Sequence, residues 1–558
     1  MTRPALASIL CLVAAACGGP PSPRGAEPAT LILVGGDVVT NVATAPHATA
    51  VAVRGSRILA VGDDATVGAL AGPDTRVVQL AGRTVTVGLT DGHCHLYGLG
   101  VASEQVNLRG LPTEAAAVAA VAAAAAGRAP GEWLEGRGWD QNLWGGQFPT
   151  RASLDAAVGG RPVALRRVDG HAVWVSSAAL AAAGITAATP DPAGGKLIRD
   201  AAGAPTGVLV DNAMSLIEAR APSPGPEVRA RRIRAAAAQA VAAGITGVHE
   251  MGIDDDTVAV YRRLAAAGEL PLRVSAYLTG DPDDLTQLAE RAIDPDDGDD
   301  YFALIGVKYF ADGALGSRGA ALAADYSDDP GNRGLWVTSP EQLDRAVAAA
   351  TRAGWQVATH AIGDAGVHAT LDAYQHAIEA NPGADLRLRV EHAQVMTADD
   401  IARLARLRVI ASMQPTHATS DMPWAEARLG PERIKGAYAW RSILDAGGFI
   451  VAGSDFPVED VAPLAGIYAA VTRQDRAGQP AGGWYPDQRL TLAEAIAAFT
   501  SAPAVAGFVE DQRGRLAPGL AADLTVYDRR LVADRSLLDA AVDLTIVGGE
   551  LVYERGRP

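Results

Sequence analysis

Short apolar runs rich in valine, isoleucine and leucine alternate with glycine and aspartate near both ends of the chain. This pattern is typical of strands joined by tight turns. It covers residues 29–86 and returns in three runs at residues 524–527, 544–547 and 550–553. Both ends are therefore expected to fold together into one small β-sandwich.

Between the ends, strand-like apolar runs alternate with alanine-rich helical segments. Such alternation predicts βα units and a parallel sheet. Eight strand candidates follow one another here, and they predict an α/β fold of the TIM-like (β/α)8 barrel type. They lie at residues 84–91, 244–250, 270–278, 303–310, 355–361, 386–392, 408–414 and 449–455.

A long stretch between the first two strand candidates interrupts this alternation. It runs from residue 96 to about residue 243, far beyond a normal βα loop, and therefore predicts an inserted subdomain at about 100–240. The insert has its own strand candidates at residues 161–167 and 207–210. The expected domains are a composite β-sandwich (29–83 and 508–558) and a barrel (84–507) that carries the insert.

Composition narrows the choice of partners. The chain has 558 residues, of which 49% are hydrophobic and 20% charged, so it can bury a large core. Its formal net charge is −16, and no basic stripe is visible along it. This excludes a nucleic-acid partner, because nucleic-acid binders gather lysine and arginine on one face. A small-molecule substrate is expected, while the oligomeric state cannot be read from the sequence.

The first residues have the layout of a signal peptide. Arg3 precedes an apolar run at residues 5–16 that is too short to span a bilayer, and small residues lead to Cys17. This resembles a bacterial lipobox, in which Cys17 would be lipidated after removal of residues 1–16, with residues 17–28 as a tether. The alternative is an ordinary cleaved signal with a chance cysteine. We expect an exported lipoprotein on the periplasmic or cell-surface side, in contact with a membrane only through its lipid anchor.

The strongest local signal for chemistry closes the first barrel strand. There the chain reads Thr90-Asp91-Gly92-His93-Cys94-His95. Histidines at positions i and i+2 of a strand point to the same face, so His93 and His95 can reach one ion. Active sites of such barrels lie at the carboxyl ends of the strands, which is where this pair stands.

Four other strand candidates carry a polar residue near their ends. Lys308, His360, His392 and Asp455 belong to the fourth, fifth, sixth and eighth strands, and Lys308 stands amid apolar neighbours. Burying such groups is costly unless they are paired. A divalent metal centre would satisfy all of them together with His93.

These residues, in this strand order, resemble the ligand series of the amidohydrolase superfamily. Further phrases resemble the branch that includes N-substituted formamide deformylase, and the resemblance covers nearly all of the chain after the predicted signal. The phrases are Arg137-Gly138-Trp139-Asp140, Asp169-Gly170-His171, Val307-Lys308-Tyr309-Phe310-Ala311-Asp312-Gly313, Thr359-His360-Ala361-Ile362-Gly363-Asp364 and Glu391-His392-Ala393.

The resemblance implies two divalent metal ions, with zinc expected, bridged by Lys308 that carbon dioxide has carboxylated. His93, His95 and Asp455 would hold one ion, and His360 and His392 the other. Asp455 would act as general base and then general acid while a metal-bound hydroxide attacks a non-peptide carbon–nitrogen bond, of the amide or N-formyl type.

Several alternatives stay open at this point. Lys308 could be unmodified and paired with a carboxylate such as that of Asp312, beside a single metal, and Mn, Fe or Co could replace zinc. The same site could cleave esters, lactones or phosphotriesters, or the barrel could be a non-catalytic binding lipoprotein.

Further candidates concern the pocket around the metals. His171 and Asp312 are candidates for substrate contacts, and Trp139 for the pocket wall or the core of the insert. His417 is a candidate for the pocket rim, and His249 for a supporting or structural role.

Overall fold

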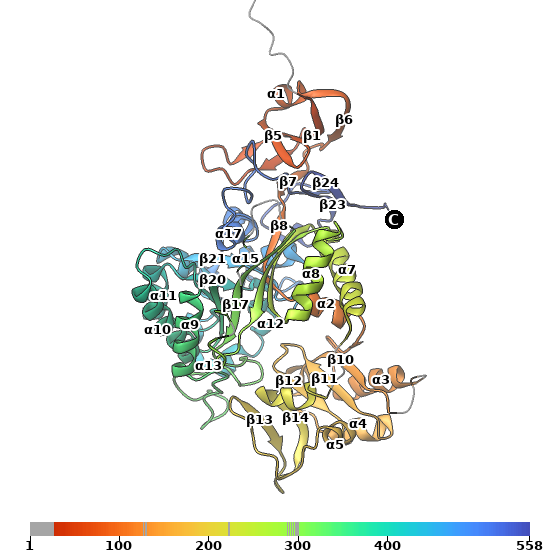
Figure 1. Cartoon of the computed structure of the whole chain (residues 1–558), viewed down its shortest axis with the longest axis vertical. Coiled ribbons are helices and arrows are strands. Elements are labelled where there is room, and N and C mark those ends of the chain that lie inside the picture. The colour runs from red at the N-terminus through yellow and green to blue at the C-terminus, as the bar shows by residue number, and fades with distance from the viewer. Residues whose placement is uncertain are drawn as a thin grey trace, which may run out of the picture.

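The computed structural model describes residues 27–126, 128, 131–220, 224–286, 288–289, 291, 293, 295 and 301–557. The predicted signal peptide (1–16) and Cys17 lie outside the described residues. Figure 1 shows the sheets built by the chain ends at the top, the barrel in the middle and the insert at the bottom. Among the described residues, no helix is long and apolar enough to cross a membrane.

The centre is an eight-stranded parallel sheet whose order follows the chain, from β21 through β20 to β15 and finally β8. This mixed α/β arrangement forms a nearly closed barrel and is consistent with the predicted TIM-like barrel. The strands are β8 (Leu89–Cys94), β15 (Ile245–Ile253), β16 (Arg273–Thr279), β17 (Phe302–Phe310), β18 (Gln356–Ala361), β19 (Arg389–His392), β20 (Ile410–Met413) and β21 (Phe449–Ala452).

Helices surround this sheet and bury one apolar face against it. In α9, for example, Leu343, Ala346, Val347 and Ala350 recur at helical spacing and are buried. The helices are α2 (Leu96–Ala102), α7 (Pro226–Ala242), α8 (Asp255–Ala266), α9 (Pro340–Arg352), α10 (Asp364–Ala380), α11 (Ala398–Leu407), α12 (Pro415–Asp421), α13 (Ala425–Arg433), α14 (Trp440–Asp445), α15 (Pro463–Thr472), α16 (Leu492–Ala498) and α17 (Ser501–Ala506). Short 3-10 turns are η1 (Gln141–Trp144), η2 (Asn212–Met214), η3 (Ile434–Gly436), η4 (Pro486–Gln488) and η5 (Arg535–Leu537).

The first and last barrel strands approach each other closely near their carboxyl ends. Two glycines permit this, because a Cβ at Gly453 would lie 2.5 Å from the backbone nitrogen of His93, and one at Gly92 would lie 2.2 Å from Val451 Cγ1. The Asp455 N–H donates to the His93 carbonyl at 2.8 Å. The near-closure of the barrel therefore coincides with the predicted metal ligands.

The expected first barrel strand, at residues 84–91, is two strands, and this corrects the prediction. β7 (Thr84–Val87) pairs with strands of the chain ends, and β8 alone belongs to the barrel. The chain passes from one sheet to the other at Gly88, where a Cβ would lie 2.2 Å from Thr246 Oγ1. The continuous β-favouring pattern conceals this break, because the contact that requires glycine is non-local.

The chain ends form two sheets that share one buried core. One sheet orders its strands β5-β4-β1-β6, and the other β24-β23-β22-β7-β2-β3. In the second sheet three strands from the C-terminal end adjoin three from the N-terminal end, and the two groups meet where β22 pairs with β7. The description of this part as a sandwich stays a prediction. The elements are β1 (Ala29–Val34), β2 (Asp37–Val39), β3 (His47–Ala48), β4 (Ala50–Arg54), β5 (Arg57–Gly62), α1 (Asp64–Gly68), β6 (Ala71–Gln79), β22 (Leu524–Tyr527), β23 (Val542–Val547) and β24 (Glu550–Glu554).

The insert between β8 and β15 has a six-stranded sheet of its own, ordered β13-β14-β12-β11-β10-β9. Figure 1 places it beyond the end of the barrel opposite to the sheets of the chain ends. Its elements are β9 (Val106–Asn107), α3 (Glu114–Ala125), β10 (Leu134–Trp139), α4 (Arg151–Val158), β11 (Val163–Arg167), β12 (Ala172–Val175), α5 (Ser177–Ala182), β13 (Gly195–Arg199), β14 (Pro205–Asp211) and α6 (Ser215–Glu218).

Candidate metal centre

Five barrel strands end around one point, and there the structure gathers the side chains that the sequence singled out. The ring centroids of His93 and His392 are 4.9 Å apart, and those of His360 and His392 are 4.6 Å apart. His93 and His95 stand edge to face with centroids 5.7 Å apart. All but His95 are buried, and the His95 side chain is 34% exposed, so the cluster opens to solvent on that side.

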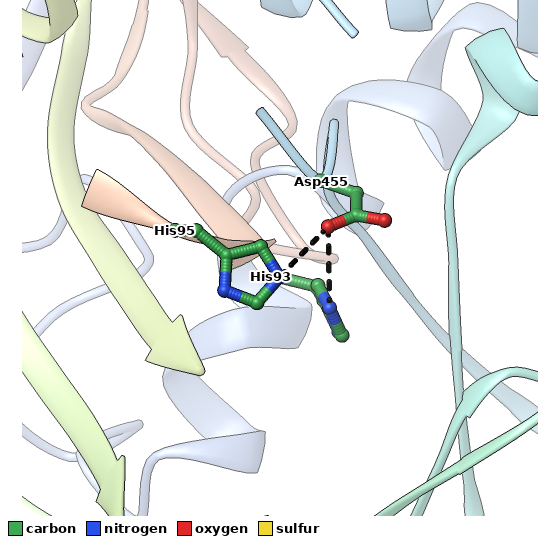
Figure 2. A group of neighbouring side chains, drawn as sticks. All are labelled: His93, His95 and Asp455. Atoms are coloured by element: carbon green, nitrogen blue, oxygen red, sulfur yellow. Dashed lines mark ion pairs between the residues drawn. The ribbon is translucent and has the colours of Figure 1, made fainter. Parts of the chain in front are cut away.

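Asp455 faces both His93, in β8, and His95, directly after it, and Figure 2 marks its ion pairs with the two rings. Its Oδ1 is 3.1 Å from His95 Nε2 and 3.6 Å from His93 Nε2. Its Oδ2 is 3.8 Å from Nε2 of His417, whose ring stacks on that of His392. Asp455 has a positive φ of 58°, and this left-handed conformation lets its backbone bond to β8 while the carboxylate turns inward.

Three of the imidazoles are oriented in the same way. Each has its Nδ1 against a fixed acceptor, which leaves Nε2 as the atom that can bind a metal. The acceptors are Glu391 Oε2 for His93 (2.5 Å), the Met251 carbonyl for His95 (2.9 Å) and Gln414 Oε1 for His392 (2.8 Å).

His360 is oriented differently from these three imidazoles, because its Nε2 faces Gly313 and Asp312. The His360 Nε2 lies 3.2 Å from the Gly313 carbonyl and 3.6 Å from Asp312 Oδ1, which leaves Nδ1 for another partner. Asp312 itself is fully buried, and its carboxylate accepts three backbone N–H groups. These belong to Ala321, Ile362 and Gly363, at 2.8 to 3.0 Å. These hydrogen bonds tie together the loops that follow β17 and β18, and a contact between Asp312 and substrate stays a prediction.

The protonation states suit a metal centre. Burial and the nearby charge of Lys308 lower the pKa of His93 to about 4, and burial holds the pKa values of His360 and His392 well below their usual range. Burial alone would raise the pKa of Asp455, but the neighbouring imidazoles hold it well below its ordinary value. At neutral pH His93, His360 and His392 are therefore neutral and Asp455 is a carboxylate, the forms that bind metals.

The donor atoms themselves test whether an ion fits. His93 Nε2 and Asp455 Oδ1 are buried and make no hydrogen bond within the part of the chain that the structure describes. With His95 Nε2 they form one group whose atoms lie within 4.8 Å of one another, and His392, His417 and Asp455 form a second. Imidazole nitrogens with a carboxylate oxygen are donors that zinc accepts, so the residues fit a divalent ion.

Lys308 is buried in the same barrel end, at the close of β17. Burial lowers its pKa to about 8, although Glu391 and Asp455 act in the opposite direction. Among the described residues it forms no ion pair, with Asp312 or any other carboxylate, and its Nζ lies 5.2 Å from the ring centroid of Phe310. The expected alternative of a Lys308–Asp312 pair is thus not found.

The insert contributes His171 to the site. Its ring lies 4.8 Å from that of His360, and its Nδ1 is 2.7 Å from Oδ1 of Asp211. Burial lowers the pKa of His171, but Asp211 and Asp169 raise it more, so the net shift is upward. Trp139, by contrast, is fully buried in the core of the insert beside Trp144 and Trp174, with its Nε1 donating to the Leu165 carbonyl. The structure therefore brings His171 to the metal centre but not Trp139.

Sequence reasoning missed the residues that hold the ligands in place. Glu391 accepts hydrogen bonds from Arg389, which is fully buried and also bonds to His249 Nδ1 at 2.6 Å. A charged Arg-x-Glu-His run inside an apolar strand was the available signal. Gln414, directly after β20, could have been found by applying the same strand-end rule to the seventh strand. His417, expected at the pocket rim, has its Nε2 3.8 Å from Asp455 Oδ2.

Comparison with known proteins agrees with this geometry. The model of the amidohydrolase family matches residues 76–553. Protein LONG AFTER FAR-RED 3 of Arabidopsis thaliana is 34% identical over 538 residues, which cover 94% of this chain and 92% of the relative. N-substituted formamide deformylase of Arthrobacter pascens is 30% identical over 546 residues, with 94% and 98% covered. A crystal structure of an uncharacterized metal-dependent hydrolase from Pyrococcus furiosus superposes with a TM-score of 0.70 at 28% identity, covering 89% of this chain and 99% of that one.

The chain belongs to the amidohydrolase family, and the predicted resemblance is confirmed. The family and its hydrolase relatives support a metal-dependent hydrolase that acts on small molecules.

Proposed function

We propose that this protein hydrolyses a carbon–nitrogen bond outside peptide backbones, in an amide or an N-formyl group. The observation that carries the proposal is the convergence of His93 Nε2, His95 Nε2 and Asp455 Oδ1, two of them buried without a hydrogen bond. The similarity to a formamide deformylase over nearly the full length of both chains favours the carbon–nitrogen bond. An ester or lactone would meet the same groups and belongs in the test.

His93, His95 and Asp455 would hold one divalent ion, and His360 and His392 a second. Such ions, zinc above all, would lower the pKa of a water molecule and polarise the substrate carbonyl. Lys308 would be carboxylated and shared between the ions. Two features support this: the side chain is buried without a counter-ion, and its low pKa makes available the neutral amine that reacts with carbon dioxide.

Asp455 is placed to carry the proton. As a carboxylate it would accept a proton from the attacking water and return it to the departing nitrogen, so that amide and water become carboxylic acid and amine. One carboxylate oxygen of Asp455 lies near Nε2 of both His93 and His95, and Nε2 of His417 lies 3.8 Å from the other oxygen. The hydrogen bonds at Nδ1 keep His93, His95 and His392 from turning away.

The test is hydrolysis of paired amides, N-formyl compounds and esters by zinc-supplemented protein, with Asp455→Asn as the variant. Loss of the general base is expected to lower kcat by about 10²- to 10⁴-fold. Asp344→Asn is the matched control, since Asp344 also pairs with a histidine, His376, but on the exposed surface. The metal content of each protein is measured at the same time.

Full activity in Asp455→Asn, or no hydrolysis of any compound by protein that has bound metal, would overturn the proposal. Cleavage of esters alone would mean that the protein hydrolyses a carbon–oxygen bond by the same mechanism and not a carbon–nitrogen bond.

A further inference from the structure

Three arginines of the insert reach toward the loops that carry the candidate active-site residues. Arg109 donates to the carbonyl of Pro457, two residues after Asp455. Arg137 Nη2 donates to the carbonyl of Val168 at 3.3 Å, and Arg166 Nη1 donates to that of Gly170 at 3.4 Å. Both carbonyls belong to the short segment that leads into His171. Arg109 therefore joins the insert to a barrel loop, while Arg137 and Arg166 hold the segment of the insert that carries His171.

Two of these arginines stand side by side with the same charge. Arg137 of β10 and Arg166 of β11 are partners in register in neighbouring parallel strands, so they share one face of the sheet. Like charges in this arrangement destabilise a sheet. Arg166 is neutralised by an ion pair with Glu218. Arg137 and Arg109, within the described residues, have no carboxylate at ion-pair distance.

Arg137 is the least satisfied of the three. A guanidinium offers five N–H donors, yet the structure gives Arg137 a single carbonyl acceptor, and its Nε is buried without any. Burial, followed by Arg166 and Arg109, lowers the pKa of Arg137 to about 9, while the charge of Asp455 raises it. Arg137 is therefore close enough to the candidate catalytic carboxylate to feel its charge. Arg137 is half-buried, and placing a guanidinium there without an ion-pair partner is costly, so an anionic ligand would lower that cost.

We propose that Arg137, with Arg109 beside it, binds a carboxylate group of the substrate, so that the compounds hydrolysed are amides or N-formyl compounds that also carry a carboxylate. This inference rests on the proposed function and specifies its substrate class. The planar guanidinium suits bidentate binding of a carboxylate. Binding there would hold the substrate between the insert and the metal centre and would fix which carbonyl meets the attacking water.

The test measures binding rather than turnover, so that it does not depend on the chemistry. In an oxo acid, a CH₂ group replaces the amide nitrogen and cannot be cleaved: 4-oxopentanoate, 5-oxohexanoate and 6-oxoheptanoate match the acetyl amides of glycine, β-alanine and 4-aminobutyrate. The full chain, supplemented with zinc, is titrated calorimetrically with these acids and with 4-oxopentanamide, which lacks the charge. The series covers the unknown distance between the carbonyl and the arginine.

We expect at least one oxo acid to bind more tightly than the uncharged amide. Arg137→Gln should weaken its binding about ten- to hundredfold, the usual effect of losing a charge-assisted hydrogen bond, and leave the amide unchanged. Arg137→Lys should restore part of the loss. Arg199→Gln is the matched control, because Arg199 lies in β13 at the far edge of the same sheet and pairs with Asp191.

The inference is overturned if the parent binds no oxo acid or binds acid and amide alike. It is also overturned if Arg137→Gln, with a native circular dichroism spectrum, weakens both equally. Selective binding of the acids without hydrolysis of any acylamino acid would uphold the anion site and contradict the proposed function instead. Hydrolysis of uncharged amides only, with no binding of oxo acids, would support the proposed function and contradict the anion site.

Discussion

At the scale of single residues, Glu391 connects the buried guanidinium of Arg389 with the buried imidazole of His93. It accepts from Arg389 Nε at 2.8 Å and lies 2.5 Å from Nδ1 of His93, and all three side chains are excluded from solvent. Arg389 and the imidazole of His93 hold the pKa of Glu391 well below its usual range, although burial acts in the opposite direction. The carboxylate thus fixes the ring of His93 with Nε2 toward Asp455.

Glu391→Gln is expected to weaken zinc binding by about 10- to 100-fold, because the ligand loses the anionic acceptor that orients it and strengthens its Nε2. The measurement is zinc titration against a competing chelator. Glu379→Gln is the control, since Glu379 is exposed and bonds only to Gln375 among the described side chains. An unchanged zinc affinity in Glu391→Gln would mean that Glu391 is a structural partner of Arg389 and no more.

The predicted metal ligands could be found in the sequence, whereas residues that orient them, such as Glu391, were missed. A histidine or lysine at the end of an apolar strand is conspicuous by its cost of burial, so His93, His360, His392 and Lys308 could be picked out along the chain. The partner of Glu391 is 298 positions away, and no local pattern joins them. Whether Lys308 is carboxylated is equally invisible, because the modification leaves no trace in the residue type.

At the scale of elements, β8 and β21 can approach each other closely because Gly92 and Gly453 have no side chain. A Cβ at either position would clash with the other strand end. Ser454 adds to this junction, since its backbone N–H and its hydroxyl both donate to the carboxylate of Asp91, the hydroxyl at 2.6 Å. Gly453 lies directly before it, and its hypothetical Cβ meets backbone atoms that cannot turn aside. The packing of two strands and the position of Asp455 are therefore coupled.

Gly453→Ala is expected to cost about 1–3 kcal/mol of unfolding free energy, as overpacking usually does, and to weaken zinc binding as well. Urea unfolding with and without zinc measures both effects. Gly68→Ala serves as the control: Gly68 ends α1, and nothing lies within 4 Å of its hypothetical Cβ, so alanine should be neutral or slightly stabilising there. A stability loss in both variants alike would argue against a specific clash at the junction.

Most strands of the barrel were predictable because each is a short apolar run between turn signals. β15, β17 and β18 begin and end within a few residues of their expected bounds. The break at Gly88 was not predictable, since residues 84–91 satisfy the pattern of one continuous strand. What divides them is the side chain of Thr246, which lies in β15, on the other side of the insert in the sequence.

At the scale of the whole molecule, the metal centre makes the metal-free protein sensitive to acid. The pKa of His93 is about 4 in the folded chain and 6.5 when unperturbed. Between these values the unfolded chain binds a proton that the folded chain does not, so stability falls as the pH falls. The contribution of His93 amounts to about 3 kcal/mol, and it is fully present above pH 6.5.

Chelator-treated parent protein should therefore lose about 3 kcal/mol more than His93→Gln between pH 6.5 and pH 4, as measured by urea unfolding. His376→Gln provides a control of opposite sign. The hydrogen bond to Asp344 raises the pKa of this exposed histidine, so its small contribution is present in acid and disappears as the pH rises through the folded pKa. Equal acid sensitivity of the parent and His93→Gln would contradict the assignment.

The pairing of β7 with β22 has a consequence for the order in which the protein can be completed. Thr86 and Thr525 are partners in that ladder, so β7 waits on the ribosome for a strand that lies much later in the chain. Until residues 524–554 emerge, one edge of β7 is open, as are the apolar side chains that β22 and β23 cover. A nascent chain stalled before that point therefore exposes an unpaired strand edge, to which chaperones and other nascent chains can bind. Moving the C-terminal strands to the front of the gene, through a linker to β1, would remove this delay while leaving every barrel strand in its place.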